Sequence, residues 1–152
     1  MSRSCGTCNL CCKLPYVVEL KKSIDTWCSH CKPGNGGCTI YADRPPSCRG
    51  FVCGWLSDKI EGCGDAWFPA RCKMYIAARP PPHEGITMTV DPAFPNAWRR
   101  EPYYSQLLEW AQQMPYVEIR VGRRFIGLCA DGSESEITKT RDWIEASGAS
   151  LN

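Results

Sequence analysis

Hydrophobic and polar positions alternate clearly only in the second half of the chain. Residues 86–90 (ITMTV) and 117–121 (VEIRV) alternate apolar and polar side chains, which predicts half-buried strands. Gly122 separates residues 117–121 from 124–130 (RFIGLCA), and a glycine between two such segments favours a tight hairpin. We therefore expect short antiparallel strands in this half of the protein.

The same half contains two candidate helices. Residues 103–114 follow Pro102, which suits a first helical turn. Apolar residues recur there at helical spacing, at Leu107, Leu108, Ala111 and Met114. Near the end of the chain, Ser133 and Glu136 have the spacing of a capping box. The apolar side and the stop of this second helix would come from Ile137, Trp143, Ile144 and Gly148.

The first 63 residues have a different character, with little periodicity beyond residues 14–20 and ten of the twelve cysteines. A chain of 152 residues with 43% hydrophobic content suits one core, and the proline-rich residues 79–85 read as a stiff connector inside it. We predict a small α+β protein of one domain, residues 1–152. A loop-rich, metal-organised cysteine region, residues 5–55, would precede an α+β portion, residues 66–150.

Composition and charge exclude several kinds of partner. The formal net charge is +2 and no long basic run extends the arginine doublets at 99–100 and 123–124, so no nucleic acid is expected as a partner. No segment approaches the roughly 18 consecutive apolar residues of a membrane span, and the start MSRSCGTC lacks the apolar run of a secretion signal. We expect no membrane partner, a cytoplasmic location and reduced thiols, which favours metal binding over disulfides.

Nine cysteines lie within residues 5–53 at spacings typical of metal ligands. These candidate ligands are Cys5, Cys8, Cys11, Cys12, Cys28, Cys31, Cys38, Cys48 and Cys53. Two patterns compete for them. The CxxC pairs at 5–8 and 28–31 match the paired knuckles of a zinc site with four thiolates. The string CxxCxxC at 5–11 instead matches the opening of an iron-sulfur segment, with a remote fourth ligand at Cys38, Cys48 or Cys53.

Neighbouring side chains suggest how such a site would be arranged. Adjacent side chains of an extended segment diverge, so Cys11 and Cys12 would serve different centres, or one of them the core. Arg44 and Arg49 flank a rigid Pro-Pro turn and are candidates to offset thiolate charge close to the cofactor. The alternative for both arginines is a solvated position.

Three further residues receive structural assignments. His30, inside the second CxxC pair, is more simply solvent-facing than a ligand. Cys129 lies in an expected strand and reads as a buried hydrophobic residue. Cys63 stands between glycines and reads as part of a loop, with reactivity as the alternative.

The scattered carboxylates have no spacing typical of acid-base catalysis. No catalytic residue is therefore identified, and enzymatic activity stays open.

The series CGTCNLCC, WCSHC and GCTIYADRPPSCRGFVCGW resembles the bacterial CxxCxxCC cysteine-cluster family of zinc- or iron-chelating domains. The resemblance covers residues 5–55 and is most specific at CxIYxxRPxxCRxF. It implies a metal-binding protein, often with an iron-sulfur cluster and with no settled activity. Its ligand positions correspond to Cys5, Cys8, Cys11, Cys12, Cys38 and Cys48, with Cys28, Cys31 and Cys53 shared by a narrower subset. It favours Cys38 or Cys48 as the remote partner of Cys5 and Cys8.

Three functions are consistent with these observations. The favoured one, on the strength of the resemblance, is a protein that carries an iron-sulfur cluster of the 4Fe-4S type in electron transfer or an accessory role. The alternative is an interaction module stabilised by zinc. A thiol redox enzyme fits less well, because the βαβ context of a thioredoxin-like CxxC is missing. The sequence identifies no protein partner.

Overall fold

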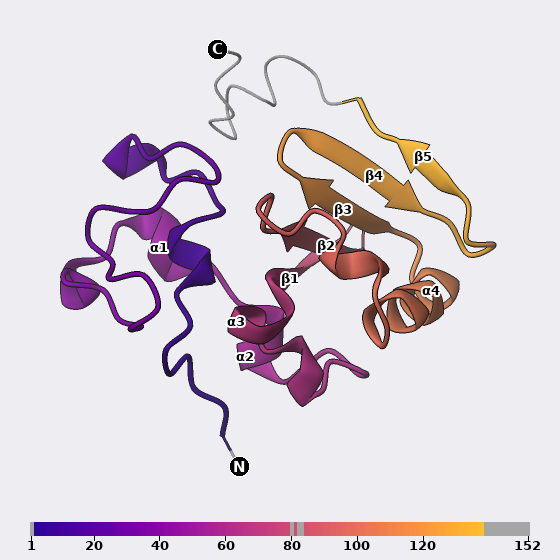
Figure 1. The fold of residues 1–152 in the computed structure, drawn as a ribbon, viewed down its shortest axis with the longest axis horizontal. Coiled ribbons are helices and arrows are strands. Elements are labelled where there is room, and N and C mark those ends of the chain that lie inside the picture. Colours follow the sequence, from indigo (N-terminus) through magenta and orange to yellow (C-terminus); the bar gives the residue numbers. More distant parts are fainter. Residues whose placement is uncertain (1, 80, 82–83, 139–152) are drawn as a thin grey trace.

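The computed structural model describes residues 2–79, 81 and 84–138, and a mixed five-stranded sheet forms its centre (Figure 1). The strands follow the order β1-β2-β3-β4-β5. They are β1 (Met74–Arg79), β2 (Gly85–Val90), β3 (Val117–Val121), β4 (Arg124–Leu128) and β5 (Glu134–Glu136). The cysteine-rich N-terminal region consists of loops and short turns beside the sheet, so the protein is α+β with a loop-rich first half, as predicted.

Three of the four strand pairs are antiparallel, but β2 and β3 are parallel, with Ile86 opposite Val117. The expectation of antiparallel strands is therefore wrong for this pair. Two parallel neighbours need a crossover, and here it contains η5 (Ala97–Arg99) and α4 (Tyr103–Gln113). The predicted hairpin between β3 and β4 is confirmed, and Gly122 turns it with a φ of 60°.

The predicted helix over residues 103–114 is confirmed as α4. The prediction that a second helix begins near Ser133 and Glu136 is wrong. Residues Glu134–Glu136 form β5, the edge strand, because the backbone of β4 on the side away from β3 pairs with them after the turn at Gly132. The rest of that predicted helix, residues 139–152, lies outside the described residues. Strand β1 escaped prediction because MYIAAR does not alternate.

One face of the sheet packs on the main hydrophobic core. Met74 and Ile76 of β1, Met88 of β2 and Ile119 of β3 point into it. Fully buried Trp98 and Trp110 fill the space between the sheet and α4, and Trp110 Nε1 donates a hydrogen bond to the Glu61 carbonyl at 2.8 Å. Apolar burial of this size stabilises the second half of the chain, and none of the nine candidate ligands is among the buried residues of this core.

The opposite face of the sheet is covered by the cysteine-rich region. Tyr75, between Met74 and Ile76, points the other way and packs with Leu10 and Leu14 in a second apolar cluster. On β3, Arg120 lies on this covered side and donates to the Leu14 carbonyl at 2.9 Å. Arg120 also pairs with Asp25 at 3.3 Å. Strand β3 is therefore buried on both faces, which the alternation of VEIRV does not indicate, whereas β5 is exposed.

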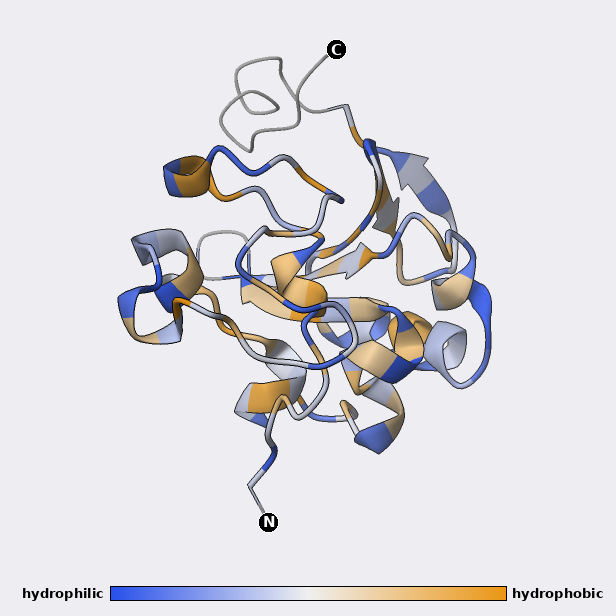
Figure 2. Cartoon of the chain, turned by 60° about the vertical axis from the view of Figure 1, so that its left-hand side comes forward, coloured by the Kyte–Doolittle hydropathy of each residue, from blue (hydrophilic) through white to orange (hydrophobic). Residues whose placement is uncertain are grey.

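Short turns build the cysteine-rich region. Figure 2 shows that its loops mix hydrophilic and hydrophobic positions along their length. Besides the strands, α4 and η5, the described chain has seven short helical elements. They are η1 (Leu10–Cys12), η2 (Val18–Leu20), η3 (Tyr41–Asp43), α1 (Pro46–Gly50), α2 (Gly54–Ser57), η4 (Asp65–Trp67) and α3 (Pro69–Cys72). Among the described residues, no helix has the length and apolar character needed to cross a membrane.

Candidate metal-binding site

The N-terminal CxxC pair sits on a tight turn. The backbone N–H of Cys8 donates to the Cys5 carbonyl at 2.7 Å, and Gly6 between them has a φ of 53°. Buried Asn9 holds the end of this turn in place, since its Nδ2 donates to the Lys32 carbonyl at 2.7 Å. The turn is therefore tied to the segment directly after the second CxxC pair.

The second CxxC pair forms a knuckle. The N–H of Cys31 donates to the Cys28 carbonyl at 3.3 Å, and the N–H of His30 points at Cys28 Sγ at 3.4 Å. Cys31 then pairs with Cys38 in an antiparallel bridge. Backbone N–H groups directed at sulfur stabilise a thiolate, which is the form of cysteine that binds metal. His30 is half-buried, and its backbone, rather than its ring, takes part in this arrangement.

The two CxxC pairs lie close together because of a glycine. Gly36 has a φ of 71°, and a Cβ built on it would collide with the backbone of Gly6. The loop between Cys31 and Cys38 therefore rests directly on the first CxxC turn. A side chain at position 36 would push the two segments apart.

Two short helices supply the remaining thiols. Glu19 accepts hydrogen bonds from the backbone N–H of Ser47 at 3.0 Å and from its hydroxyl at 2.9 Å, which fixes the first turn of α1 and with it Cys48. Cys53 precedes α2, and its carbonyl accepts from the N–H of Ser57 at 2.9 Å. Neither position could be inferred from cysteine spacing, because both depend on long-range contacts.

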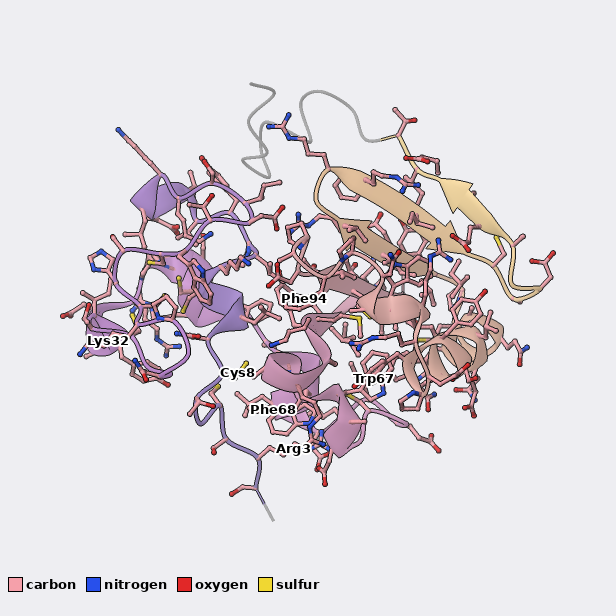
Figure 3. The ribbon with its side chains drawn as sticks, in the orientation of Figure 1. Arg3, Cys8, Lys32, Trp67, Phe68 and Phe94 are labelled. Carbon is pink, nitrogen blue, oxygen red and sulfur yellow. The ribbon has the colours of Figure 1, made fainter. Side chains whose placement is uncertain are left out.

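Four thiols line one pocket, and we call them the pocket thiols: Cys5, Cys8, Cys11 and Cys53. The other side of this pocket is apolar and includes Trp55, Leu56, Phe68 and Tyr75. Figure 3 shows Cys8 lying between the N-terminal loops and Phe68. Of the three remote ligands considered from the sequence, Cys53 is the one that lines this pocket.

The other five candidate cysteines influence one another, and we call them the knuckle thiols: Cys12, Cys28, Cys31, Cys38 and Cys48. Burial and the neighbouring charges of Cys12, Cys28 and Cys38 raise the pKa of Cys31 to about 11. Burial, together with three other knuckle thiols and Glu19, raises the pKa of Cys48. Crowding of this kind opposes ionisation in the absence of a cation, and a bound metal ion reverses it.

Cys11 and Cys12 belong to different groups that adjoin. Cys11 lines the pocket, whereas Cys12 shares a hydrogen bond with Cys31. The pKa of Cys12 is raised, first by a hydrogen bond with Cys11 and next by burial. The two neighbours thus have different surroundings, but their thiols contact each other, so their division between two centres stays a prediction.

Basic side chains accompany both groups. Lys22, which sequence reasoning missed, is buried, and its Nζ donates to the carbonyls of Lys13 at 2.8 Å and Ser23 at 2.7 Å. Burial lowers its pKa, and the nearby charges of Cys28, Asp25 and Cys12 oppose that shift. No spacing in the sequence indicates this lysine, because only the fold of its loop brings it near Cys12 and Cys28.

The two arginines considered from the sequence differ in their surroundings. The guanidinium carbon of Arg44 lies 3.9 Å from the centre of the Tyr41 ring. Burial and the charges of Cys53 and Cys12 raise the pKa of Cys5, and the charge of Arg44 partly opposes this rise. Arg49 is exposed.

The cysteines outside the two groups have other environments. Cys63 and Cys72 belong to the main core, where burial raises their pKa to about 11 and about 12. The prediction of a buried Cys129 is wrong: this residue is exposed, because β4 ends at Leu128 and the chain turns there. The Cys129 N–H donates to the Ser133 carbonyl at 2.9 Å in that turn. All twelve cysteines are free thiols.

The donor set suits a soft metal, but the sulfurs are not yet gathered around one point. Within the described residues, no three Cys, His, Asp or Glu side chains are arranged so that they could hold a metal ion as they stand. Backbone contacts nevertheless bring thiols from separate segments together, and metal binding completes such sites in many small proteins. The residues therefore fit a thiolate-bound metal that draws them inward.

Comparison with known proteins adds no relative to this picture: no family model matches the chain, and neither do curated proteins or solved structures.

Proposed function

We propose that this protein is a cytoplasmic metalloprotein that binds an iron-sulfur cluster of the 4Fe-4S type through its N-terminal thiols and serves in electron transfer or as an accessory protein. The observation that carries the proposal is that nine free thiols lie in the loops beside the sheet and that four of them line one pocket. Reduced thiols at this density have a chemical use as ligands of soft metals.

The cluster is favoured because of the pocket thiols. Four thiols are the ligand number of such a cluster, and the apolar side of their pocket would keep water from it. The hydrophobic shell around a cluster and its hydrogen bonds set the reduction potential. Donors close to the pocket would therefore influence the potential at which the protein exchanges an electron.

A zinc-stabilised interaction module is the second candidate, supported by the knuckle at Cys28 and Cys31. The His30 N–H directed at Cys28 Sγ and the bridge from Cys31 to Cys38 are contacts expected in a closed structural zinc site with four thiolates. This candidate gives the protein a binding surface and no redox chemistry.

Anaerobic purification followed by iron, sulfide and zinc analysis and visible absorbance tests these proposals. We expect a brown protein with iron and acid-labile sulfide. A colourless protein that contains only zinc would exclude the cluster and leave the zinc module. A protein without metal after reconstitution with either would overturn both.

A further inference from the structure

We propose that the thiols form two separate centres that meet between Cys11 and Cys12, an iron-sulfur cluster on the pocket thiols and a zinc ion on the knuckle thiols. This inference rests on the proposed function and assigns ligands to it. The iron-sulfur pattern at 5–11 would describe the first centre, whereas the zinc centre would keep only the second CxxC pair of the zinc pattern.

The pocket thiols come from two places that enclose one space. Cys5, Cys8 and Cys11 stand on the first turns of the chain, and Cys53 approaches at the start of α2. Trp55 lines the same pocket, and its indole N–H is buried without a hydrogen-bond partner among the described residues. A buried donor of this kind is costly unless an acceptor faces it, and the sulfur atoms of a cluster are acceptors.

The knuckle thiols are gathered by backbone contacts that do not involve the pocket. Cys28 donates its N–H to the Cys12 carbonyl at 2.9 Å, and Cys31 pairs with Cys38 across the antiparallel bridge. Cys48, on α1, is held on the same side through the contact between Ser47 and Glu19. Zinc needs four of these five thiolates to close a tetrahedral site without an open position.

The surroundings of the two groups explain why they would take different metals. The pocket has aromatic and aliphatic walls, which suit a bulky cluster that must be kept from water. The knuckle thiols belong to neither hydrophobic cluster of the described residues, and in such loops a small closed ion can replace a hydrophobic core. Four thiolates on Zn²⁺ leave a net charge of −2, and the buried ammonium of Lys22, near Cys12 and Cys28, offsets part of it.

Matched pairs of substitutions separate the two centres. The full chain carrying Cys5→Ser with Cys53→Ser leaves two pocket thiols, and the chain carrying Cys28→Ser with Cys31→Ser leaves three knuckle thiols. Cys129→Ser is the control, because this exposed thiol lies outside both groups. Each protein is purified anaerobically and analysed for iron, sulfide and zinc. Tryptophan fluorescence and circular dichroism report whether the second half is folded.

We expect the wild type and the control to contain iron, sulfide and about one zinc per chain. The pocket pair should lose iron and sulfide and keep zinc, whereas the knuckle pair should lose zinc and keep iron and sulfide. If the pocket pair does not fold, the single variant Cys53→Ser replaces it. If the knuckle pair does not fold, Cys31→Ser with Cys38→Ser replaces it, because one substitution would still leave four thiolates for zinc. Cobalt added to the apo form of the pocket pair then tests the knuckle alone, since tetrahedral thiolate coordination gives intense visible bands.

Three results would overturn the inference. In the first, one folded variant loses both metals, which means that the thiols form a single centre. In the second, the wild type holds only one kind of metal. In the first case, and in the second when the metal is iron with sulfide, the proposed function survives while the division fails. A wild type that holds only zinc excludes the cluster as well. In the third, the wild type holds no metal after reconstitution, and the proposed function fails with it.

Discussion

Replacing Arg120 by Met should loosen the cysteine-rich region from the sheet. Arg120 is 8% exposed and donates to the Leu14 carbonyl at 2.9 Å and the Gly122 carbonyl at 2.7 Å. It also contacts both carboxylate oxygens of Asp25 at 3.3 to 3.4 Å. Methionine fills much of the space but leaves Asp25 without its guanidinium partner and removes one hydrogen bond from each carbonyl. The Leu14 carbonyl keeps the Asp25 N–H at 3.1 Å.

The expected loss is about 3 kcal/mol in the free energy of unfolding. Removing one partner of a buried ion pair costs about 3–5 kcal/mol, and the long contacts to Asp25 place this case at the lower end. Urea denaturation under reducing conditions, followed by tryptophan fluorescence, measures this loss. Hydrogen exchange should show the largest increase around Leu14 and Asp25.

Arg124→Met is the matched control. Arg124 pairs with Glu136 at 3.3 Å, but the two side chains are 65% and 62% exposed, so the loss should stay below about 1 kcal/mol. Equal losses for the two substitutions, or a loss below about 1 kcal/mol for Arg120→Met, would refute the idea that Arg120 joins the two halves.

Three other predictions concern the cysteine-rich region. Chelation should raise hydrogen exchange across residues 5–53 before the sheet is affected, because these loops have few apolar contacts; unchanged protection there would contradict a structural metal. Cys48→Ser should lower the metal content of the purified protein while Cys129→Ser leaves it intact, and full content in the first variant would remove that residue from the site. Gly36→Ala should cost more stability than Gly34→Ala in the same denaturation assay, by at least about 1 kcal/mol, because both have positive φ but only position 36 lacks space for a Cβ; equal losses would show that the two loops do not need their close approach.

Much of the second half could be predicted because its elements obey one local rule each. Residues 86–90 and 117–121 alternate, and residues 103–114 repeat at helical spacing, and the structure has a strand or a helix in each place. Local patterns fail where pairing with a distant segment determines the secondary structure or the strand direction. The edge of β4 turns residues 134–136 into a strand, and the intervening crossover makes β2 and β3 parallel.

Burial of polar residues was the least predictable feature of the fold. Alternation in VEIRV indicates that Glu118 and Arg120 face away from the core, and they do. They are nevertheless buried, at 2% and 8% exposure. Arg120 contacts Leu14 and Asp25 of the cysteine-rich region, whereas Glu118 accepts from the Tyr116 hydroxyl and lies beside Arg79. The pattern within a strand does not indicate that residues about a hundred positions earlier in the chain, such as Leu14, contact its outer face.

The candidate site divides in the same way. Turns at the CxxC pairs follow from spacing alone, and both turns are present. The grouping of the thiols does not follow, because Cys53 and Cys48 are placed by α2 and α1 rather than by their distance along the chain. Lys22 has no sequence signal, since its role depends on a loop that folds it under Cys12 and Cys28.

A chain of contacts leads from the knuckle to the end of β2. Lys22, near Cys12 and Cys28, donates to the carbonyl of Lys13, and the Lys13 ammonium pairs with buried Asp91 at 2.8 Å. Asp91 comes directly after Val90, the last residue of β2. Lys22 therefore lies between the knuckle and a segment that the ion pair between Lys13 and Asp91 holds against the end of β2. Lys22→Met should then weaken zinc affinity roughly tenfold, as outer partners of metal ligands commonly do, and an unchanged affinity in a competition titration would separate this lysine from the metal.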